Sequence, residues 1–414
     1  MALLSIDTFR RLFGRDKTSA PKSDELGDGI RHSTVSDEDL TAGAPLYEDE
    51  RFLPVTFEKR DKEVKWALDH RSPDYAHLKS KGATLREFPL RADDLELLAT
   101  LNDFPVARLK DTPVLFGLRG CALAKPASGL QQEVTLKDIR PTHGKVGCVI
   151  GAWDRVRKLV AVFPASTVPM ESIVEAHYEG SSKSGNILPT GYYGYIVGSH
   201  CTESGGCRPG CFLLRYENGD KRVVPVRRAK KTNVAPGASS KVIAYDLIDE
   251  VDVCAPGDNI HPSFRSNGDS FSSWGCQVVQ GNYTNGAHTR PWADFRRAAG
   301  MTDDDGDPKR RYDYMLLTGV EAMRASDARL QGKVDDPAFR MSLRRLRFGS
   351  EGPAVMALQK ALALAAPDGT LGPATCEALY RRQRSLWKKD CDGIYSPDFD
   401  QQIGGNVFVV PAVA

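Results

Sequence analysis

A histidine and a cysteine stand fifteen residues apart in the second half of the chain. His261 ends the segment Asp258-Asn-Ile-His261, and Cys276 ends Ser273-Trp-Gly-Cys276. A free thiol is only a few per cent ionised at neutral pH, and an imidazole that accepts its proton makes it a nucleophile. Gly275 lets backbone approach a carbonyl group, and the N–H groups around Gly275 and Cys276 are natural donors to an oxyanion. The pattern predicts a nucleophilic cysteine with a histidine base, provided that a short loop between two strands brings them together.

Simpler interpretations of the same residues remain open. Cys276 precedes two valines, and a cysteine in such a place is often only a small buried side chain. His261 can be a structural histidine, and His200 and His288 are rival candidates for the base.

A zinc site is a further alternative, because imidazole and thiolate are the ligands that zinc prefers. The candidate ligands are His200, Cys201, Cys207, Cys211 and Cys254. Their Cys-x5-Cys-x3-Cys spacing is not a standard ligand pattern, so incidental thiols or a disulfide explain the group better. We therefore expect neither a metal nor another cofactor.

Length and composition limit the class of protein. A chain of 414 residues exceeds what one core usually covers, so we expect two or three domains. The net charge of +2 gives no reason to expect a nucleic-acid partner, and no apolar run approaches the ~18 residues that a transmembrane helix needs. Nine cysteines without regular spacing indicate synthesis in a reducing compartment with mostly free thiols.

The patterning predicts a multidomain α+β protein. Residues 1–45 are polar and predict a disordered leader, and residues 46–140 predict a small α/β region of unknown role. Residues 141–328 contain short apolar strands and predict a mainly β domain, with Asn218-Gly219 as a hairpin turn. Residues 208–231 carry eight Arg or Lys against two acidic residues, which indicates either a solvated face or a surface for an anionic polymer.

Residues 340–403 predict a separate small helical bundle. Pro353 and Pro373 suit the first turns of two helices, and Asp368-Gly369 and Asp392-Gly393 form paired turns. This unit resembles the peptidoglycan-binding domain attached to many cell-wall hydrolases. The matching residues are Gly349, Gly352, Val355, Leu358, Gln359, Leu362, Asp368, Gly369, Gly372, Thr375, Ala378, Gln383, Asp392 and Gly393. The resemblance implies a unit that anchors the chain to murein.

The upstream motifs resemble the L,D-transpeptidase (YkuD-like) catalytic domain. They are Leu188-Pro189-Thr190-Gly191 before a strand, then Ile260-His261, then Ser273-Trp274-Gly275-Cys276. The resemblance implies that Cys276 is the nucleophile and His261 the base. It also implies that Ser273 and Gly275 shape the turn and oxyanion pocket. The further residues assigned to substrate binding are Trp274, Thr190 and Gly191.

The chain departs from the family at two positions. Pro262 follows the histidine where the family usually has glycine, and Val278 stands where the family usually has an arginine two residues after the cysteine. That arginine is associated with the catalytic loop or with the substrate carboxylate. We expect Arg290 to substitute for it in substrate binding.

The resemblance implies attack by Cys276 on the L,D peptide bond of a murein stem tetrapeptide, through a thioester acyl-enzyme. Water as acceptor gives an L,D-carboxypeptidase, a second stem an L,D-transpeptidase, and a free D-amino acid an exchange reaction. The rivals are a non-catalytic wall-binding protein and a zinc-dependent peptidoglycan peptidase.

The N-terminus does not resemble a secretory signal, because Asp7, Arg10 and Arg11 interrupt its apolar residues. Since the substrate lies outside the inner membrane, we expect delivery by another route. An antibacterial effector with a secretion-system carrier or an immunity protein as partner, and a phage lysis protein, both fit this expectation.

Overall fold

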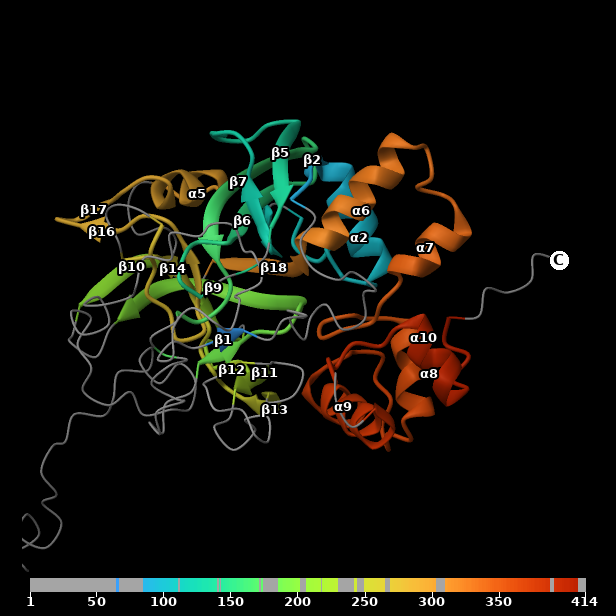
Figure 1. Cartoon of the computed structure of the whole chain (residues 1–414). Helices are drawn as coiled ribbons and strands as arrows, with labels where there is room; N and C mark the ends of the chain where they lie inside the picture. Colours follow the sequence, from blue (N-terminus) through green and yellow to red (C-terminus); the bar gives the residue numbers. More distant parts are fainter. Residues whose placement is uncertain are drawn as a thin grey trace, which may run out of the picture.

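The computed structural model in Figure 1 shows a mixed α+β protein. It describes residues 65–66, 85–110, 112–139, 141, 143–170, 173, 185–201, 206–216, 218–229, 242–243, 249–264, 269–302, 310–387 and 391–408. The leader expected over residues 1–45 lies outside these ranges. The described residues contain seven helices and one large closed sheet. None of these helices is both long and apolar enough to span a bilayer.

Eight strands close into a barrel in the order β10-β14-β15-β7-β6-β3-β18-β9. Their bounds are β3 Val114–Arg119, β6 Cys148–Asp154, β7 Leu159–Ser166, β9 Gly191–Cys201, β10 Cys207–Leu214, β14 Ile260–Pro262, β15 Gln277–Val279 and β18 Arg311–Thr318. Six neighbouring pairs are antiparallel, whereas β14–β15 and β3–β18 are parallel. The two short strands β14 and β15 therefore complete the closure between β10 and β7.

The barrel strands are buried on both faces, which explains their nearly continuous apolar sequences. In β18, Tyr312 and Leu316 belong to one hydrophobic cluster, while the alternate residues Met315 and Leu317 belong to another. The first cluster continues into α5 (Trp292–Ala298), whose Trp292 is fully buried.

The second cluster includes the helix α2 (Ala92–Leu101) and the helix α6 (Gly319–Leu330), which pack against each other. A three-stranded sheet of the order β2-β5-β4 adjoins them, with β2 Glu87–Arg91, β4 Cys121–Leu123 and β5 Glu133–Asp138. Arg329 of α6 forms an ion pair with the buried Asp94 of α2 at 2.8 Å. Figure 1 shows α2, α6 and α7 (Pro337–Leu343) together on one side of the sheet.

The domain boundary predicted at residue 140 is therefore wrong. β3 belongs to the barrel between β6 and β18, although it lies within the predicted N-terminal region. α2 and the barrel strands also share one core. Backbone pairing between β3 and β18, about 200 residues apart in sequence, makes the two regions one unit.

The remaining strands form small sheets. β11 (Val224–Ala229) pairs with β13 (Asp249–Cys254) and β8 (Asn186–Ile187), β1 (Lys65–Trp66) pairs with β12 (Val242–Ile243), and β16 (Tyr283–Thr284) pairs with β17 (Ala287–His288). The predicted turn at Asn218-Gly219 forms, with Gly219 at φ +89° and a single bridge between Arg215 and Lys221. It does not join a regular hairpin, because β11 leaves β10 for the other sheet.

The C-terminal unit contains α8 (Pro353–Ala361), α9 (Pro373–Trp387) and α10 (Pro397–Ile403) around its own core. The starts of α8 and α9 agree with the sequence prediction, whereas α10, which also begins with a proline, was not predicted. The core extends to Phe408, beyond the predicted end at residue 403, because Asp400 accepts hydrogen bonds from the backbone of Val407 and Phe408.

The two Asp-Gly turns of this unit are built alike, 24 residues apart. The amide nitrogen of Gln359 donates to Asp368 at 2.7 Å, and its oxygen accepts from Gly369 N at 2.8 Å. Gln383 makes the same two bonds to Asp392 and Gly393, each at 2.8 Å. Both glycines have positive φ, +75° and +69°, which only glycine adopts readily. The unit is thus an internal structural duplication.

A buried ion pair joins this unit to the barrel. Arg347 donates to Glu321 at the start of α6 at 2.5 Å, and both side chains are inaccessible to solvent. Arg347 also donates to the Thr190 hydroxyl at 2.8 Å, and Tyr192 N donates to Phe348 O at 2.8 Å. The contact therefore includes the segment that leads into β9.

We expect Arg347→Met to lower the free energy of unfolding by about 3–5 kcal/mol, because it leaves the Glu321 carboxylate buried without its partner. The double variant Arg347→Met/Glu321→Gln recovers part of this loss. Arg381→Ala, which removes the exposed pair with Glu377, is the control and changes stability by less than about 1 kcal/mol. Urea denaturation measures all three, and equal effects of the buried and exposed variants contradict the prediction.

Candidate functional site

The segment Ser273–Cys276 forms a tight turn directly before β15. The Ser273 hydroxyl donates to Cys276 O at 2.7 Å and accepts from Gly275 N at 3.1 Å. A Cβ on Gly275 would lie 2.5 Å from Asn186 Cβ and 2.6 Å from Asp258 Oδ1, so this position requires glycine. Ser273 and Gly275 therefore shape the turn that carries the cysteine, as the sequence predicts.

Of the two N–H groups expected to donate to an oxyanion, the structure gives a partner for the one at Gly275. Its N–H is directed to the Ser273 hydroxyl within the turn and is not presented to a substrate. The other expected donor, the Cys276 N–H, stays a prediction.

His261 lies in the middle of β14, where it pairs in register with Val278 of the parallel strand β15. Its side chain is only 2% exposed. The Nδ1 atom lies 2.6 Å from Pro262 O, and because a carbonyl oxygen only accepts, Nδ1 carries the proton. The Nε2 atom of neutral His261 therefore has a lone pair, as a general base requires.

Burial lowers the pKa of His261 to about 3, against the hydrogen bond to Pro262 O, and the positive charge of Arg208 lowers the pKa further. His261 is accordingly neutral throughout the physiological range. It can accept a proton transiently, but its protonated, imidazolium form is not stable.

Three side chains with lone-pair donor atoms meet at the site. Sγ of Cys276 and one ring nitrogen each of His200 and His261 all lie within 4.8 Å of one another. Cys276 is half-buried, and its Sγ lies 3.8 Å from Gly257 O. The structure thus brings together the predicted cysteine and histidine and adds His200, which the sequence offers only as a rival base.

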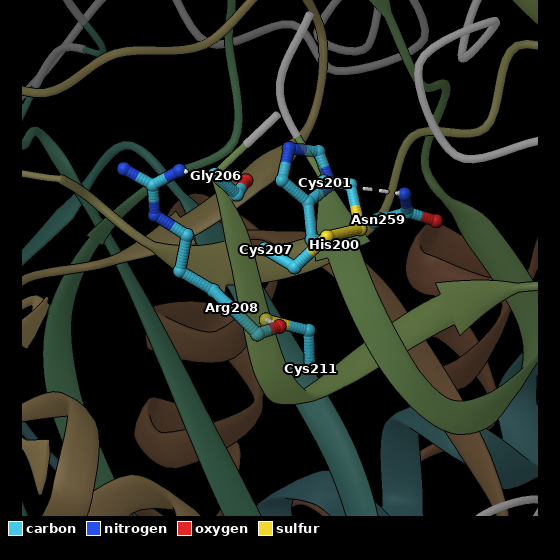
Figure 2. Close-up of a disulfide and its surroundings, with 7 residues drawn as sticks. All are labelled: His200, Cys201, Gly206, Cys207, Arg208, Cys211 and Asn259. Carbon is cyan, nitrogen blue, oxygen red and sulfur yellow. Dashed lines mark hydrogen bonds between the residues drawn. A yellow bond between two sulfur atoms is a disulfide. The ribbon is translucent and has the colours of Figure 1, made fainter. Parts of the chain in front are cut away.

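His200 is held at the end of β9 by Asn259, as Figure 2 shows. Asn259 Nδ2 lies 3.2 Å from His200 Nδ1, and the two rings of His200 and His261 are stacked with centroids 4.2 Å apart. The other rival base, His288, accepts from Trp292 Nε1 at 3.0 Å on β17 and is not in the group of three.

A disulfide lies next to His200. Cys201 and Cys207 are paired across β9 and β10, in register with each other, and Figure 2 shows the bond beside the His200 ring. A disulfide sulfur is not a thiolate ligand, so the zinc site considered over Cys201, Cys207 and Cys211 is excluded. The thiol of Cys211 is buried and donates to Arg208 O at 3.2 Å.

The structure places two of the predicted substrate-binding residues away from this group. Thr190 is 1% exposed and bonded to Arg347, and a Cβ on Gly191 would lie 2.7 Å from Phe348 O. Both residues therefore serve the contact with the C-terminal unit, and their assignment to substrate binding is wrong.

The other two predicted binding residues remain accessible. Trp274 is half-buried beside Cys276 and packs on the cluster around Val278. Arg290 has a 76% exposed side chain that pairs with Asp294 of α5 at 3.4 Å. The structure shows no contact of Arg290 with the three-residue group.

Three residues near the site were not predicted from the sequence. Phe264 stacks on His261 with centroids 4.5 Å apart, Arg208 lies 4.4 Å over the Phe264 ring, and Asn259 orients His200. Arg208 supplies a positive charge near the site, and Val278 is fully buried. Of these three residues, only Asn259 lies within a sequence motif that points to the site, because it is two residues before His261.

Comparison of the chain with protein families, curated proteins and solved structures finds no match.

The two buried histidines His261 and His143 make stability depend on pH. Burial lowers the pKa of His143 to about 3 as well, and its Nδ1 bonds Pro169 O at 2.5 Å. The unfolded chain binds these protons near pH 6.5, but the folded chain does not. Their contribution to stability is present above pH 6.5 and decreases by about 1.4 kcal/mol per histidine for each pH unit down towards pH 3.

We therefore expect the free energy of unfolding to fall between pH 6.5 and 5, and the slope against pH to be smaller in His143→Asn. Denaturant titrations at each pH measure both slopes. A free energy that is constant over this range contradicts the prediction.

The disulfide predicts a second effect on stability. The double variant Cys201→Ser/Cys207→Ser should lose roughly 2 kcal/mol, because the short closed loop no longer restricts the unfolded chain. Cys254→Ser, which changes a half-buried cysteine outside the disulfide, is the matched control. Reduction of the unmodified chain should lower its unfolding midpoint as much as the double substitution does. A midpoint that does not change when a reducing phosphine is added contradicts the prediction.

Proposed function

We propose that this protein is a peptidoglycan-modifying cysteine enzyme that acts on the L,D bond of stem tetrapeptides, with Cys276 as nucleophile and His261 as base. The observation that carries the proposal is the close approach of the half-buried Cys276 sulfur to the imidazole of His261. The motifs shared with the L,D-transpeptidase catalytic domain support this assignment, and the barrel would then be the catalytic domain.

The chemistry follows from the two side chains. His261 Nε2 accepts the thiol proton, and the sulfur attacks the carbonyl carbon that precedes the terminal D-Ala. The C–N bond breaks, D-Ala leaves with the proton from His261, and a thioester remains on Cys276. Water then gives the tripeptide acid, whereas a second stem amine or a D-amino acid gives transpeptidation or exchange.

The C-terminal unit would bind murein. The residues of its duplicated Asp-Gly turns and the glutamines bonded to them are among those that resemble peptidoglycan-binding domains. Since it contacts the barrel through Arg347, it would hold the catalytic site near a bound glycan strand and raise the local substrate concentration. As part of this proposal, the protein would reach murein as an antibacterial effector or as a phage lysis protein.

A zinc-dependent peptidase is the second candidate. The group His200, His261 and Cys276 offers two imidazoles and one thiol, and three protein ligands with one open position are typical of catalytic zinc. In this alternative Cys276 would be a ligand, so loss of activity in a Cys276 variant alone does not separate the two mechanisms.

The test incubates the purified chain with a disaccharide tetrapeptide and follows products by chromatography and mass spectrometry. We expect release of D-Ala, a covalent acyl adduct on Cys276, and roughly a thousandfold or greater loss of turnover in Cys276→Ala. Cys254→Ala, which removes another half-buried cysteine outside the disulfide, is the control and should retain activity.

A chelator separates the mechanisms. Turnover that survives the chelator, together with the covalent adduct, supports the cysteine mechanism. Turnover that stops with chelator and returns with zinc supports the peptidase. Binding to murein sacculi without any turnover would identify a non-catalytic wall-binding protein.

A further inference from the structure

His200 belongs to a strand that the cysteine–histidine motif does not include. It lies on β9, where it pairs in register with Arg208 of β10, and it is followed directly by the disulfide-bonded Cys201. Its ring nitrogen lies within 4.8 Å of both Cys276 Sγ and a His261 nitrogen. A third polar side chain so close to the thiol can influence the protonation of that thiol.

The protonation of His200 follows from its neighbour. Asn259 Oδ1 accepts from Leu214 N at 3.0 Å, and this backbone donor fixes the orientation of the amide. The other amide atom, Nδ2, therefore faces His200 Nδ1 at 3.2 Å and donates to it. Because Nδ1 is an acceptor, the proton of neutral His200 is on Nε2.

The two histidines of the site consequently have opposite tautomers. His261 carries its proton on Nδ1, bonded to Pro262 O, and presents a lone pair on Nε2. His200 accepts at Nδ1 and presents an N–H on Nε2. One ring can remove a proton from the thiol, and the other can donate to the anion that results.

We infer that His200 Nε2–H is a hydrogen-bond donor to the Cys276 thiolate and stabilises the nucleophilic form of that side chain. This inference rests on the proposed function in taking Cys276 as the nucleophile. Such a donor is needed because His261 is buried and does not hold the proton as a stable cation, and because the Gly275 N–H is engaged within its own turn.

Other groups also act on the sulfur and must be held constant in a test. Arg208 lies over Phe264, which itself stacks on His261, and Tyr195 and Asp258 are close enough to interact with the site. The charged and titratable groups around the site are His200 and Tyr195 on β9, Arg208 on β10, and Asp258 and His261 at or just before β14. The variants below change His200 alone.

The experiment measures the alkylation rate of Cys276 by iodoacetamide against pH, in the full chain, by peptide mass spectrometry. A sulfur–carbon bond forms, the carbon–iodine bond breaks and iodide leaves, so the rate follows the thiolate fraction. In His200→Leu, which keeps an apolar side chain but has no donor, we expect the midpoint to rise by about one pH unit. In His200→Gln, whose amide N–H can replace Nε2–H, we expect a midpoint near that of the unmodified chain.

Two results overturn the inference. One is a His200→Leu midpoint equal to that of the unmodified chain. The other is a His200→Gln midpoint as high as that of His200→Leu, which assigns His200 a packing role only. Far-ultraviolet circular dichroism and the unfolding midpoint establish that both variants are folded.

The readout needs no murein substrate, so it is independent of the proposed activity. A shift as expected without muropeptide turnover leaves this inference standing and removes the proposed function. Muropeptide turnover with unshifted midpoints supports the proposed function and overturns this inference.

Discussion

Asn259 is the residue on which the geometry of the candidate site depends. It directly precedes β14, is 1% exposed, and connects this strand to three others through its backbone and its side chain. Its carbonyl accepts from Gln277 N at 2.8 Å, which helps to set β15 beside β14. Its side-chain amide accepts from Leu214 of β10 and donates to His200 of β9. Because both the oxygen and the nitrogen of the buried side-chain amide are bonded, the amide has one orientation, which determines the tautomer of His200. The same residue contributes to barrel closure through its backbone carbonyl.

The parallel pair β14–β15 explains how two residues distant in sequence meet. A parallel pair needs a crossover connection, and the residues between Pro262 and Gln277 supply it. Cys276 comes directly before β15 while His261 lies in the middle of β14, so the two side chains are placed by backbone pairing. The Ser273 turn then fixes the approach of the cysteine, and the lack of a side chain at Gly275 lets the turn lie against Asn186 and Asp258.

The sequence was informative where the signal is local. Apolar runs predicted the strands, prolines predicted the starts of α8 and α9, and the spacing of His261 and Cys276 predicted a pair that does lie close together. It failed where contacts join distant segments. Nothing in residues 114–119 indicates pairing with β18, and nothing near His200 indicates a neighbour 76 residues later. The Thr190-Gly191 turn was given a binding role because its contact with Arg347 is also non-local.

The burial of His261 sets the electrostatic character of the site. A catalytic cysteine is often held as a thiolate beside an imidazolium, but a ring that is almost inaccessible to solvent and near the positive Arg208 disfavours that second charge. Under the proposed function, the negative charge must then be balanced by fixed donors and by Arg208, which lies over Phe264. Since Arg208 and His200 are paired across β9 and β10 and the Cys201–Cys207 disulfide closes the adjacent position, both groups are held by one strand pair. Under the proposed function, these groups of the barrel wall would preorganise the electrostatics of the site, and His261 would need only to transfer a proton.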